Sequence, residues 1–473
     1  MELLHFPNEL LETVAEYVLP EGFESLALTC KRMHAVCAPF IEYHNRLRRQ
    51  FQDFYYYKTN PSQLVKSNPA LLLLPDTISS AFNLIGRIAM EPVVARYIQH
   101  ADFNHDSRIT KGLSRQYATD NSREEAVMKM LADSSDLKQA GLDWKEYYAA
   151  IEEDLNAARY SQHAAAFALT LLPHLKTLQL PRWWKPQTAP DKLIDIIISK
   201  ARNAPGSGSS LAAVTSLVGN GCAENRFDLD WARPLLALPN VQSFGGYICK
   251  GTGGSYGNAP FEYAALENIS LIDASIDEAA IASVLQCTPN LKTFRCLYAR
   301  AEDSDPQQGW DLCQFLLAIE QNVGNHLIDL SLLVDAEDHV SITPGKVSIC
   351  GFQRLQRLEL PFKIAVCNLT AVTPTSPESL ISDIIPASVS QLSFVSHGTS
   401  DEAKALEVMF HDFFAKKSQL PALQEIHLTL PMEATDSYKE HFVTVSAEIE
   451  RAGVKLVEEP FIQSATWEDD ENE

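Results

Sequence analysis

The sequence has a deficit of basic residues and no long apolar run. Its 39 lysines and arginines stand against 61 aspartates and glutamates, which gives a formal net charge of −22. This balance disfavours binding to the phosphate backbone of nucleic acids and to anionic membrane surfaces. The longest apolar stretch, residues 164–172, has about half the length that a membrane-spanning helix requires. We therefore expect neither a nucleic acid nor a membrane as a partner.

The chain also lacks the usual cysteine and histidine motifs. Its nine cysteines are an odd number without any C-x-x-C pair, and no H-E-x-x-H occurs among the thirteen histidines. This usage favours free thiols in a reducing compartment over a disulfide framework or a zinc site. Residues 1–5 contain an acid and no basic cluster, so no signal peptide is expected. These features predict an intracellular protein, cytoplasmic or nuclear, without a metal or cofactor.

What the chain does have is enough apolar sequence for a large core. With 473 residues, 46% of them hydrophobic, it can form about three ordinary domains, or one domain followed by a repeat array.

The N-terminal segment predicts a first amphipathic helix. Pro7 suits a first helical position because it needs no hydrogen-bond donor there, and Glu9 favours the positive end of the helix dipole. Leu10, Val14 and Val18 recur at helical spacing and form an apolar stripe. The helix is expected to end at Pro20 and Gly22.

Two further short helices are expected before residue 50. The apolar run of residues 23–28 leads into a helix with Met33, Val36 and Phe40 at helical spacing, and Pro39 is expected to disturb its far end. A module of this size buries little surface alone. Its apolar residues are therefore expected to continue into a partner or into the rest of the chain.

Residues 6–43 resemble the F-box of SCF-type ubiquitin ligase receptors. The shared features, in the family's order, are Phe6-Pro7, Glu9-Leu10-Leu11, the apolar helix through residues 14–18, and the run from Leu26 to Met33. The resemblance implies contact with the Skp adaptor, and through it with a cullin scaffold. The implied adaptor-binding residues are Phe6, Pro7, Leu10, Leu11, Val14, Leu26, Cys30 and Met33.

Two other interpretations of this segment remain. The helices can simply cap the following domain, or they can form a helix-turn-helix that reads DNA, although the negative charge of the chain disfavours the latter. The layout of a short F-box at the N-terminus followed by weak repeats looks like that of fungal F-box proteins.

Beyond residue 95 the sequence repeats an apolar hexamer, apolar-x-x-apolar-x-apolar. Clear copies begin at Leu175, Leu266, Leu327, Leu355 and Leu423. Weaker copies begin at Ile98, Val214, Val241, Leu291 and Val389. Amphipathic segments of helical period lie between them, as in residues 277–287 and 310–323.

This hexamer resembles the core of a leucine-rich repeat, in which alternate residues of a short strand point into a solenoid. Successive copies are unevenly spaced, with 25 residues between Val241 and Leu266 but 36 between Leu291 and Leu327, and the repeat's asparagine is missing. We therefore predict an α/β fold with a degenerate leucine-rich-repeat-like solenoid of parallel strands and helices. An ordinary α/β domain that contains such hexamers by chance is the alternative.

The expected layout has four parts: a three-helix F-box in residues 1–50, a helical linker in 51–94, the degenerate array in 95–463 and an acidic disordered tail in 464–473. The resemblance implies a substrate-recognition subunit of an SCF-type ubiquitin ligase that holds a protein substrate on the array and carries no catalytic residue. A non-degradative F-box protein that uses the adaptor as a structural subunit is the alternative.

Two motifs imitate catalytic or metal sites. Residues 253–257 satisfy the G-x-S-x-G pattern of a hydrolase nucleophile at Ser255, but neither a buried strand nor a clear helix flanks them. Asp102, Asn104 and Asp106 begin like a calcium loop, but the glycine and the final glutamate of that loop are replaced by Ser107 and Leu113. We interpret the first motif as a flexible loop and the second as a strand that ends in a polar loop.

Overall fold

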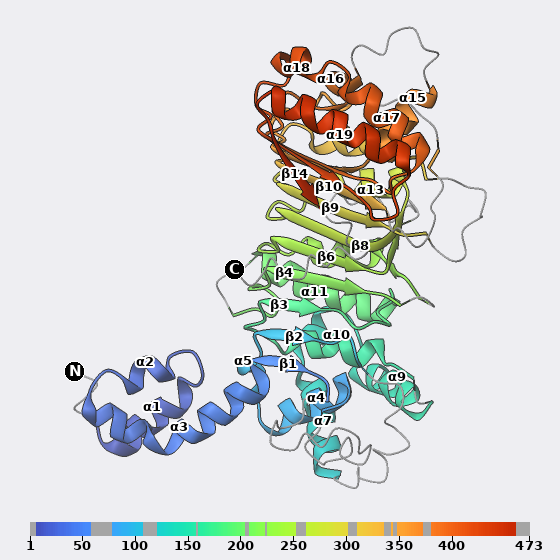
Figure 1. The fold of residues 1–473 in the computed structure, drawn as a ribbon. Coiled ribbons are helices and arrows are strands. Elements are labelled where there is room, and N and C mark those ends of the chain that lie inside the picture. Colours follow the sequence, from blue (N-terminus) through green and yellow to red (C-terminus); the bar gives the residue numbers. More distant parts are fainter. Residues whose placement is uncertain are drawn as a thin grey trace. The chain divides into compact units, whose positions relative to one another are not determined.

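The computed structural model describes residues 6–57, 78–106, 121–157, 159–203, 208–222, 225–251, 262–300, 310–334, 342–343, 348–371 and 380–459. The chain forms two compact units. One comprises residues 1–220 and 231–241, and the other comprises residues 221–230 and 242–473. Both units combine parallel strands with helices, as the sequence predicted (Figure 1).

The first unit begins with helices and continues with short parallel strands separated by helices. Strands β1 to β4 pair in chain order. The elements are α1 (Asn8–Tyr17), α2 (Phe23–Ala27), α3 (Lys31–Phe51), β1 (Asp53–Tyr55), α4 (Ala81–Met90), α5 (Val94–Tyr97), β2 (His100–Asp102), α7 (Asn121–Asp133), α8 (Ser135–Gln139), α9 (Trp144–Asn156), α10 (Gln162–Thr170), β3 (Thr177–Gln179), α11 (Thr188–Asn203), β4 (Ser216–Asn220) and most of α12 (Leu229–Leu236).

The second unit is built on a longer parallel sheet. Its main sheet has the order β6-β8-β9-β10-β11-β12-β13-β14, and β5 and β7 pair beside β8. The elements are β5 (Phe227–Asp228), β6 (Ser243–Tyr247), β7 (Cys249–Gly251), β8 (Asn268–Ile276), α13 (Glu278–Leu285), β9 (Thr293–Tyr298), α14 (Leu312–Val323), β10 (Asp329–Val334), β11 (Arg357–Pro361), α15 (Lys363–Ala371), α16 (Leu380–Ile384), β12 (Gln391–Val395), α17 (Ser400–Phe410), α18 (Phe413–Lys416), η4 (Lys417–Gln419), β13 (Glu425–Thr429), α19 (Asp436–Arg451) and β14 (Lys455–Glu459).

The apolar hexamers lie on these strands with their apolar side chains buried. The central apolar residues are aligned from strand to strand, so that Phe294 pairs with Leu330 and Leu330 with Leu358. The same row continues through Leu392 to Ile426. All five side chains are buried. The prediction of apolar residues stacked on neighbouring parallel strands is confirmed: a period of two places the fourth and sixth positions of each hexamer on the same face.

Segment 51–94, expected as a helical linker, contains a strand. Residues Asp53–Tyr55 form β1 and pair in parallel with β2, and Ala81–Met90 form helix α4. Phe54 lies opposite Ala101, and both side chains are buried. The parallel strands of the first unit therefore begin within three residues of the end of α3 rather than at residue 95. The predicted acidic tail, residues 464–473, lies outside the described residues.

Helix α3 is longer than the short helix expected from the sequence. It extends over 21 residues, with Pro39 in its interior. The proline removes the hydrogen bond to the carbonyl of Ala35. The helix continues because both its halves are packed, Val36 in the N-terminal cluster and Leu47 further along. Among the described helices, none combines the length and hydropathy needed to cross a bilayer.

Candidate protein-interaction surfaces

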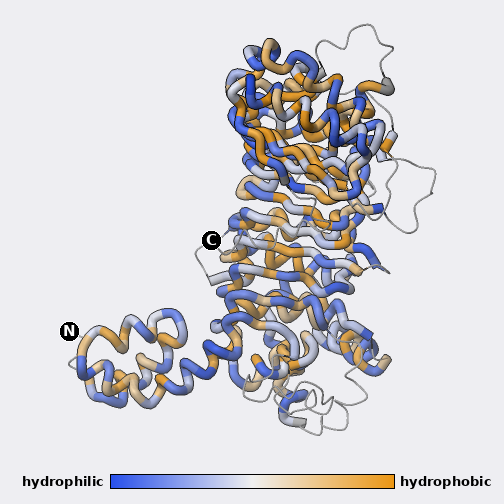
Figure 2. The backbone as a smooth tube through the Cα atoms, viewed as in Figure 1, coloured by the Kyte–Doolittle hydropathy of each residue, from blue (hydrophilic) through white to orange (hydrophobic). Residues whose placement is uncertain are grey.

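Helices α1, α2 and α3 pack around a small apolar cluster, and we call residues 6–51 the helical module. Hydrophobic and hydrophilic residues are interspersed along these helices (Figure 2). The buried members of the cluster are Leu11, Ala15, Leu19, Phe23, Ala27, Met33, Val36 and Cys37. One side of each helix is therefore used for packing within the module.

The residues implied by the F-box resemblance separate into exposed and buried sets. Pro7 and Leu10 are exposed, and Leu10 keeps 52% of its surface accessible. Phe6, Val14 and Leu26 are half-buried against the cluster or beside it. On α1, Leu10 and Val14 lie one turn apart and form an accessible apolar row.

Leu11 and Met33 do not lie on this surface. Both are buried within the module, where they contact its other helices. The resemblance implied that Leu11 and Met33 contact the adaptor together with Leu10 and Val14, but both side chains are enclosed within the module. Neighbouring positions on a helix point about 100° apart, and here Leu11 faces the cluster while Leu10 points away from it. Cys30 has a local role, since its thiol accepts a hydrogen bond from the Met33 amide at 3.5 Å and caps α3.

Two exposed apolar residues were missing from the sequence-based set. Tyr17 and Leu28 each keep 81% of their surface accessible. Tyr17 follows Leu10 and Val14 at helical spacing, so it extends the row to the end of α1. The spacing was visible in the sequence, but it did not reveal that this side of α1 faces away from the cluster. We call Leu10, Val14 and Tyr17 the apolar row.

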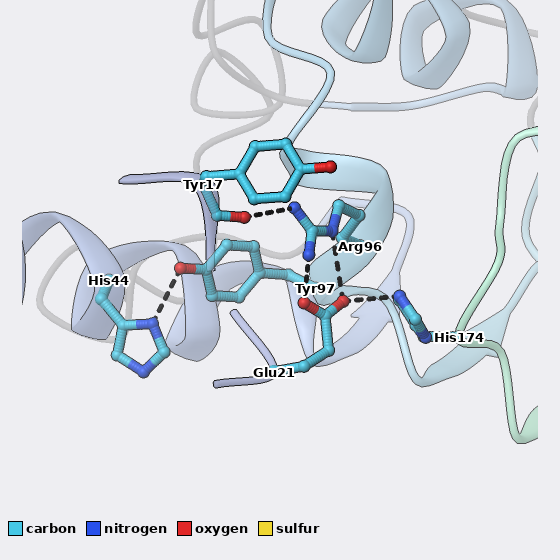
Figure 3. A network of polar contacts seen from close by, with 6 residues as sticks. All are labelled: Tyr17, Glu21, His44, Arg96, Tyr97 and His174. Atoms are coloured by element: carbon cyan, nitrogen blue, oxygen red, sulfur yellow. Dashed lines mark hydrogen bonds and ion pairs between the residues drawn. The ribbon is translucent and has the colours of Figure 1, made fainter. Parts of the chain in front are cut away.

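A network of polar contacts joins the helical module to the elements that follow it (Figure 3). The Glu21 carboxylate, in the loop between α1 and α2, is paired with the guanidinium of Arg96 on α5, whose Nε donates to Oε1 at 3.2 Å. His174 Nε2, in the loop before β3, lies 2.5 Å from the same oxygen. Arg96 Nη1 also donates to the carbonyl of Tyr17 at 3.2 Å. Arg96 therefore binds both the loop and the C-terminal end of α1, where helix carbonyls lack partners.

A buried layer lies beside this network. His44 Nδ1 on α3 is 2.8 Å from the hydroxyl of Tyr97, the residue after Arg96, and both side chains are buried. The imidazole also contacts the ring of Phe23, at 4.8 Å between centroids. Burial lowers the pKa of His44, although Glu24 opposes this effect. The neutral imidazole is therefore the form that fits this position.

A second surface is formed by the strand residues that point away from the core of the second unit. Their charges pair along the sheet: the carboxylate of Asp329 lies 3.6 Å from Arg295 and 3.7 Å from Arg357 on the two adjacent strands. Further along, Lys455 Nζ lies 2.7 Å from Glu425 Oε1 and its hydrogen bond lowers the pKa of that carboxyl. These outward side chains therefore offer paired, opposite charges and hydrogen-bonding groups.

The polar loop after β2 is not arranged as a calcium site in its described part. Asp102 Oδ1 accepts a hydrogen bond from the Asn104 amide at 2.8 Å. Asp106 is buried and accepts one from the Ala81 amide at 3.2 Å. Across the described ranges, no group of three or more His, Cys, Asp or Glu side chains is placed to hold a metal ion. Ser255 of the hydrolase-like motif lies outside the described residues.

Comparison with known proteins adds no family to these observations. A scan against protein-family models gives no match, and a search of the curated proteins gives none either.

Proposed function

We propose that this protein is the substrate-recognition subunit of an SCF-type cullin-RING ubiquitin ligase. In this proposal the helical module is an F-box that binds a Skp-type adaptor, and the parallel strands and helices are a degenerate leucine-rich-repeat-like array that holds a protein substrate. The observation that supports it most directly is the apolar row of Leu10, Val14 and Tyr17, which is left accessible while Leu11 on the same helix is buried.

The apolar row has the chemistry of a helix-in-groove contact. A partner with a complementary groove would remove these side chains from water, and full burial of a large apolar side chain is worth about 1.5–3 kcal/mol. Leu28, at the end of α2, is accessible to the same degree as Tyr17 and is a candidate for the edge of the contact. The order of the F-box-like residues in the sequence supports a Skp-type adaptor as that partner.

The array contributes recognition in this proposal, and other subunits contribute the chemistry of ubiquitin transfer. The outward residues of neighbouring strands, such as Arg295, Asp329 and Arg357, form paired charges that suit hydrogen bonding to a polar protein surface. We therefore propose a receptor that is not itself an enzyme, that works inside the cell in the cytoplasm or nucleus, and that needs no cofactor.

The test is co-purification with a Skp-type adaptor. Leu10→Asp together with Val14→Asp should abolish co-purification, because two carboxylates would enter an apolar contact. The matched control is Met432→Asp together with Val443→Asp, which makes the same chemical change at two exposed apolar residues of the second unit. The control should bind like the wild type. Retained binding by the first variant, with its helical content unchanged, would refute the assignment of the module.

The same pair of variants separates a degradative receptor from a structural subunit. In cells, proteins captured by the array should have longer half-lives in the presence of the Leu10→Asp/Val14→Asp variant than with the control variant. Unchanged half-lives, combined with loss of adaptor binding, would favour the non-degradative alternative.

A further inference from the structure

Helix α3 provides the first connection between the helical module and the sheet of the first unit. Its N-terminal half carries Met33 into the apolar cluster, and its C-terminal half buries Leu47 and Phe51. The carbonyl of Gln52 then accepts hydrogen bonds from the amides of Gln99 and His100, at 3.1 and 3.0 Å. The end of α3 is thus attached directly to the strand β2.

A single helix resists bending but leaves rotation about its own axis less restrained. The loop between α1 and α2 supplies a second attachment away from that axis. There the Glu21 carboxylate is held by Arg96 from α5 and by His174 from the loop before β3 (Figure 3). Arg96 presents two guanidinium nitrogens to the carboxylate, a geometry that restricts direction as well as distance.

Residues of α3 add a second set of contacts that hold the helical module against α5. His44 binds Tyr97, and Tyr97 is adjacent to Arg96 on the short helix α5. On the other side, the hydroxyl of Tyr43 donates to Glu91, which is itself paired with Arg87 of α4. Helices α3 and α5 are therefore connected to each other at the point where Glu21 also binds.

We propose that Glu21 is a positioning residue. Its pairing with Arg96 and His174 fixes the orientation of the helical module, and hence of the apolar row, relative to the sheet β1–β4. The consequence rests on the proposed function: an adaptor bound to the module is held at one angle to the sheet β1–β4.

The exposure of the three side chains determines what a variant will show. Glu21, Arg96 and His174 are 39%, 36% and 35% exposed. Ion pairs with this much solvent contact add little to global stability. A variant at Glu21 should therefore fold normally and lose only the restraint on orientation, which makes the inference testable.

The first experiment measures amide hydrogen exchange in the full-length protein. Glu21→Gln keeps the size of the side chain but removes its charge. Peptides covering residues 16–26 and 91–100 should exchange about two- to fivefold faster, because losing a half-exposed ion pair makes local opening slightly easier. The control is Glu16→Gln, an exposed acid on α1 with the same loss of charge. Peptides covering β13 should be unchanged in both variants.

A double-mutant comparison tests whether Glu21 acts through Arg96. Arg96→Gln should accelerate exchange in the same peptides, and the two effects should be less than additive in the double variant, because both changes remove the shared Glu21–Arg96 pair. Additive effects, or no effect of Glu21→Gln, would overturn the positioning role. His174→Gln should give a smaller increase, because the Arg96 pair is retained.

The second experiment uses the receptor as its own acceptor of ubiquitin. In a reconstituted ligase, mass spectrometry identifies which lysines of this chain are modified. Glu21→Gln should leave adaptor affinity within about twofold of the wild type but should spread modification over more lysines. Normal adaptor binding with an unchanged lysine pattern refutes the positioning role. Failure of the wild type to bind any adaptor refutes the proposed function instead, and the exchange experiment then decides on Glu21 alone.

Discussion

Asp106 is the residue for which the structure predicts the clearest pH-dependent effect on stability. Its carboxyl is fully enclosed after β2, where Oδ2 accepts hydrogen bonds from the Ala81 amide at 3.2 Å and from the Tyr56 hydroxyl at 3.5 Å. Burial raises its pKa from 3.8 to about 7, although both hydrogen bonds act in the opposite direction. The perturbation is Asp106→Asn, which keeps an oxygen acceptor for Ala81 but cannot ionise.

The sign and size of the effect follow from this shift. Because the folded-state pKa is the higher one, the folded protein holds a proton that the unfolded chain has lost, and the free energy of unfolding falls as the pH rises from 3.8 towards 7. A shift of this size costs roughly 4 kcal/mol at a pH of about 7.5 and about 1.7 kcal/mol at a pH of about 5. Asp106→Asn should therefore be more stabilising at the higher pH, by about 2–3 kcal/mol.

The assay is urea unfolding of the wild type and Asp106→Asn at both pH values, followed by circular dichroism and tryptophan fluorescence. Only the difference between the two proteins is interpreted, so the titration of other groups cancels. Tyr56→Phe is a companion variant with Asp106 intact. Losing the hydrogen bond from Tyr56 should raise the pKa of Asp106 further, so the stability of this variant should depend more strongly on pH than that of the wild type. An equal difference between wild type and Asp106→Asn at the two pH values would refute the reasoning.

Two further predictions concern the stacked strands and the buried histidine. Leu330→Ala or Leu358→Ala should lower the free energy of unfolding, measured with urea, by about 2–5 kcal/mol. The control Met432→Ala, at an exposed site, should change it by less than about 0.5 kcal/mol. Equal effects of the leucine and methionine variants would show that the leucines are not in a packed core. Because burial lowers the pKa of His44, the wild type should lose stability relative to His44→Phe as the pH falls below about 6.5. A difference that is constant between pH values of about 7.5 and 5.5 would contradict the neutral imidazole beside Tyr97.

The sequence by itself located most of the described parallel strands and their buried apolar residues. The hexamers beginning at Leu327 and Leu355 became the strands β10 and β11, with Leu330 opposite Leu358. Helices expected at residues 277–287 and 310–323 became α13 and α14, with slightly shorter bounds. These features are local: the period of two in a strand and of 3.6 in a helix assigns a face to each side chain without reference to distant residues.

Only the tertiary structure decided which side of the first helix is used for packing. Periodicity placed both Leu10 and Leu11 on an apolar helix, but packing against α2 and α3 buried Leu11 and left Leu10 accessible. The pairing of Glu21 with Arg96 joins residues 75 positions apart. Likewise, the sequence shows Asp106 only as one acid of a calcium-like pattern, whereas the structure buries its carboxyl against the Ala81 amide. Such contacts depend on chain segments that meet only after folding, and one sequence carries no local signal for a partner so distant.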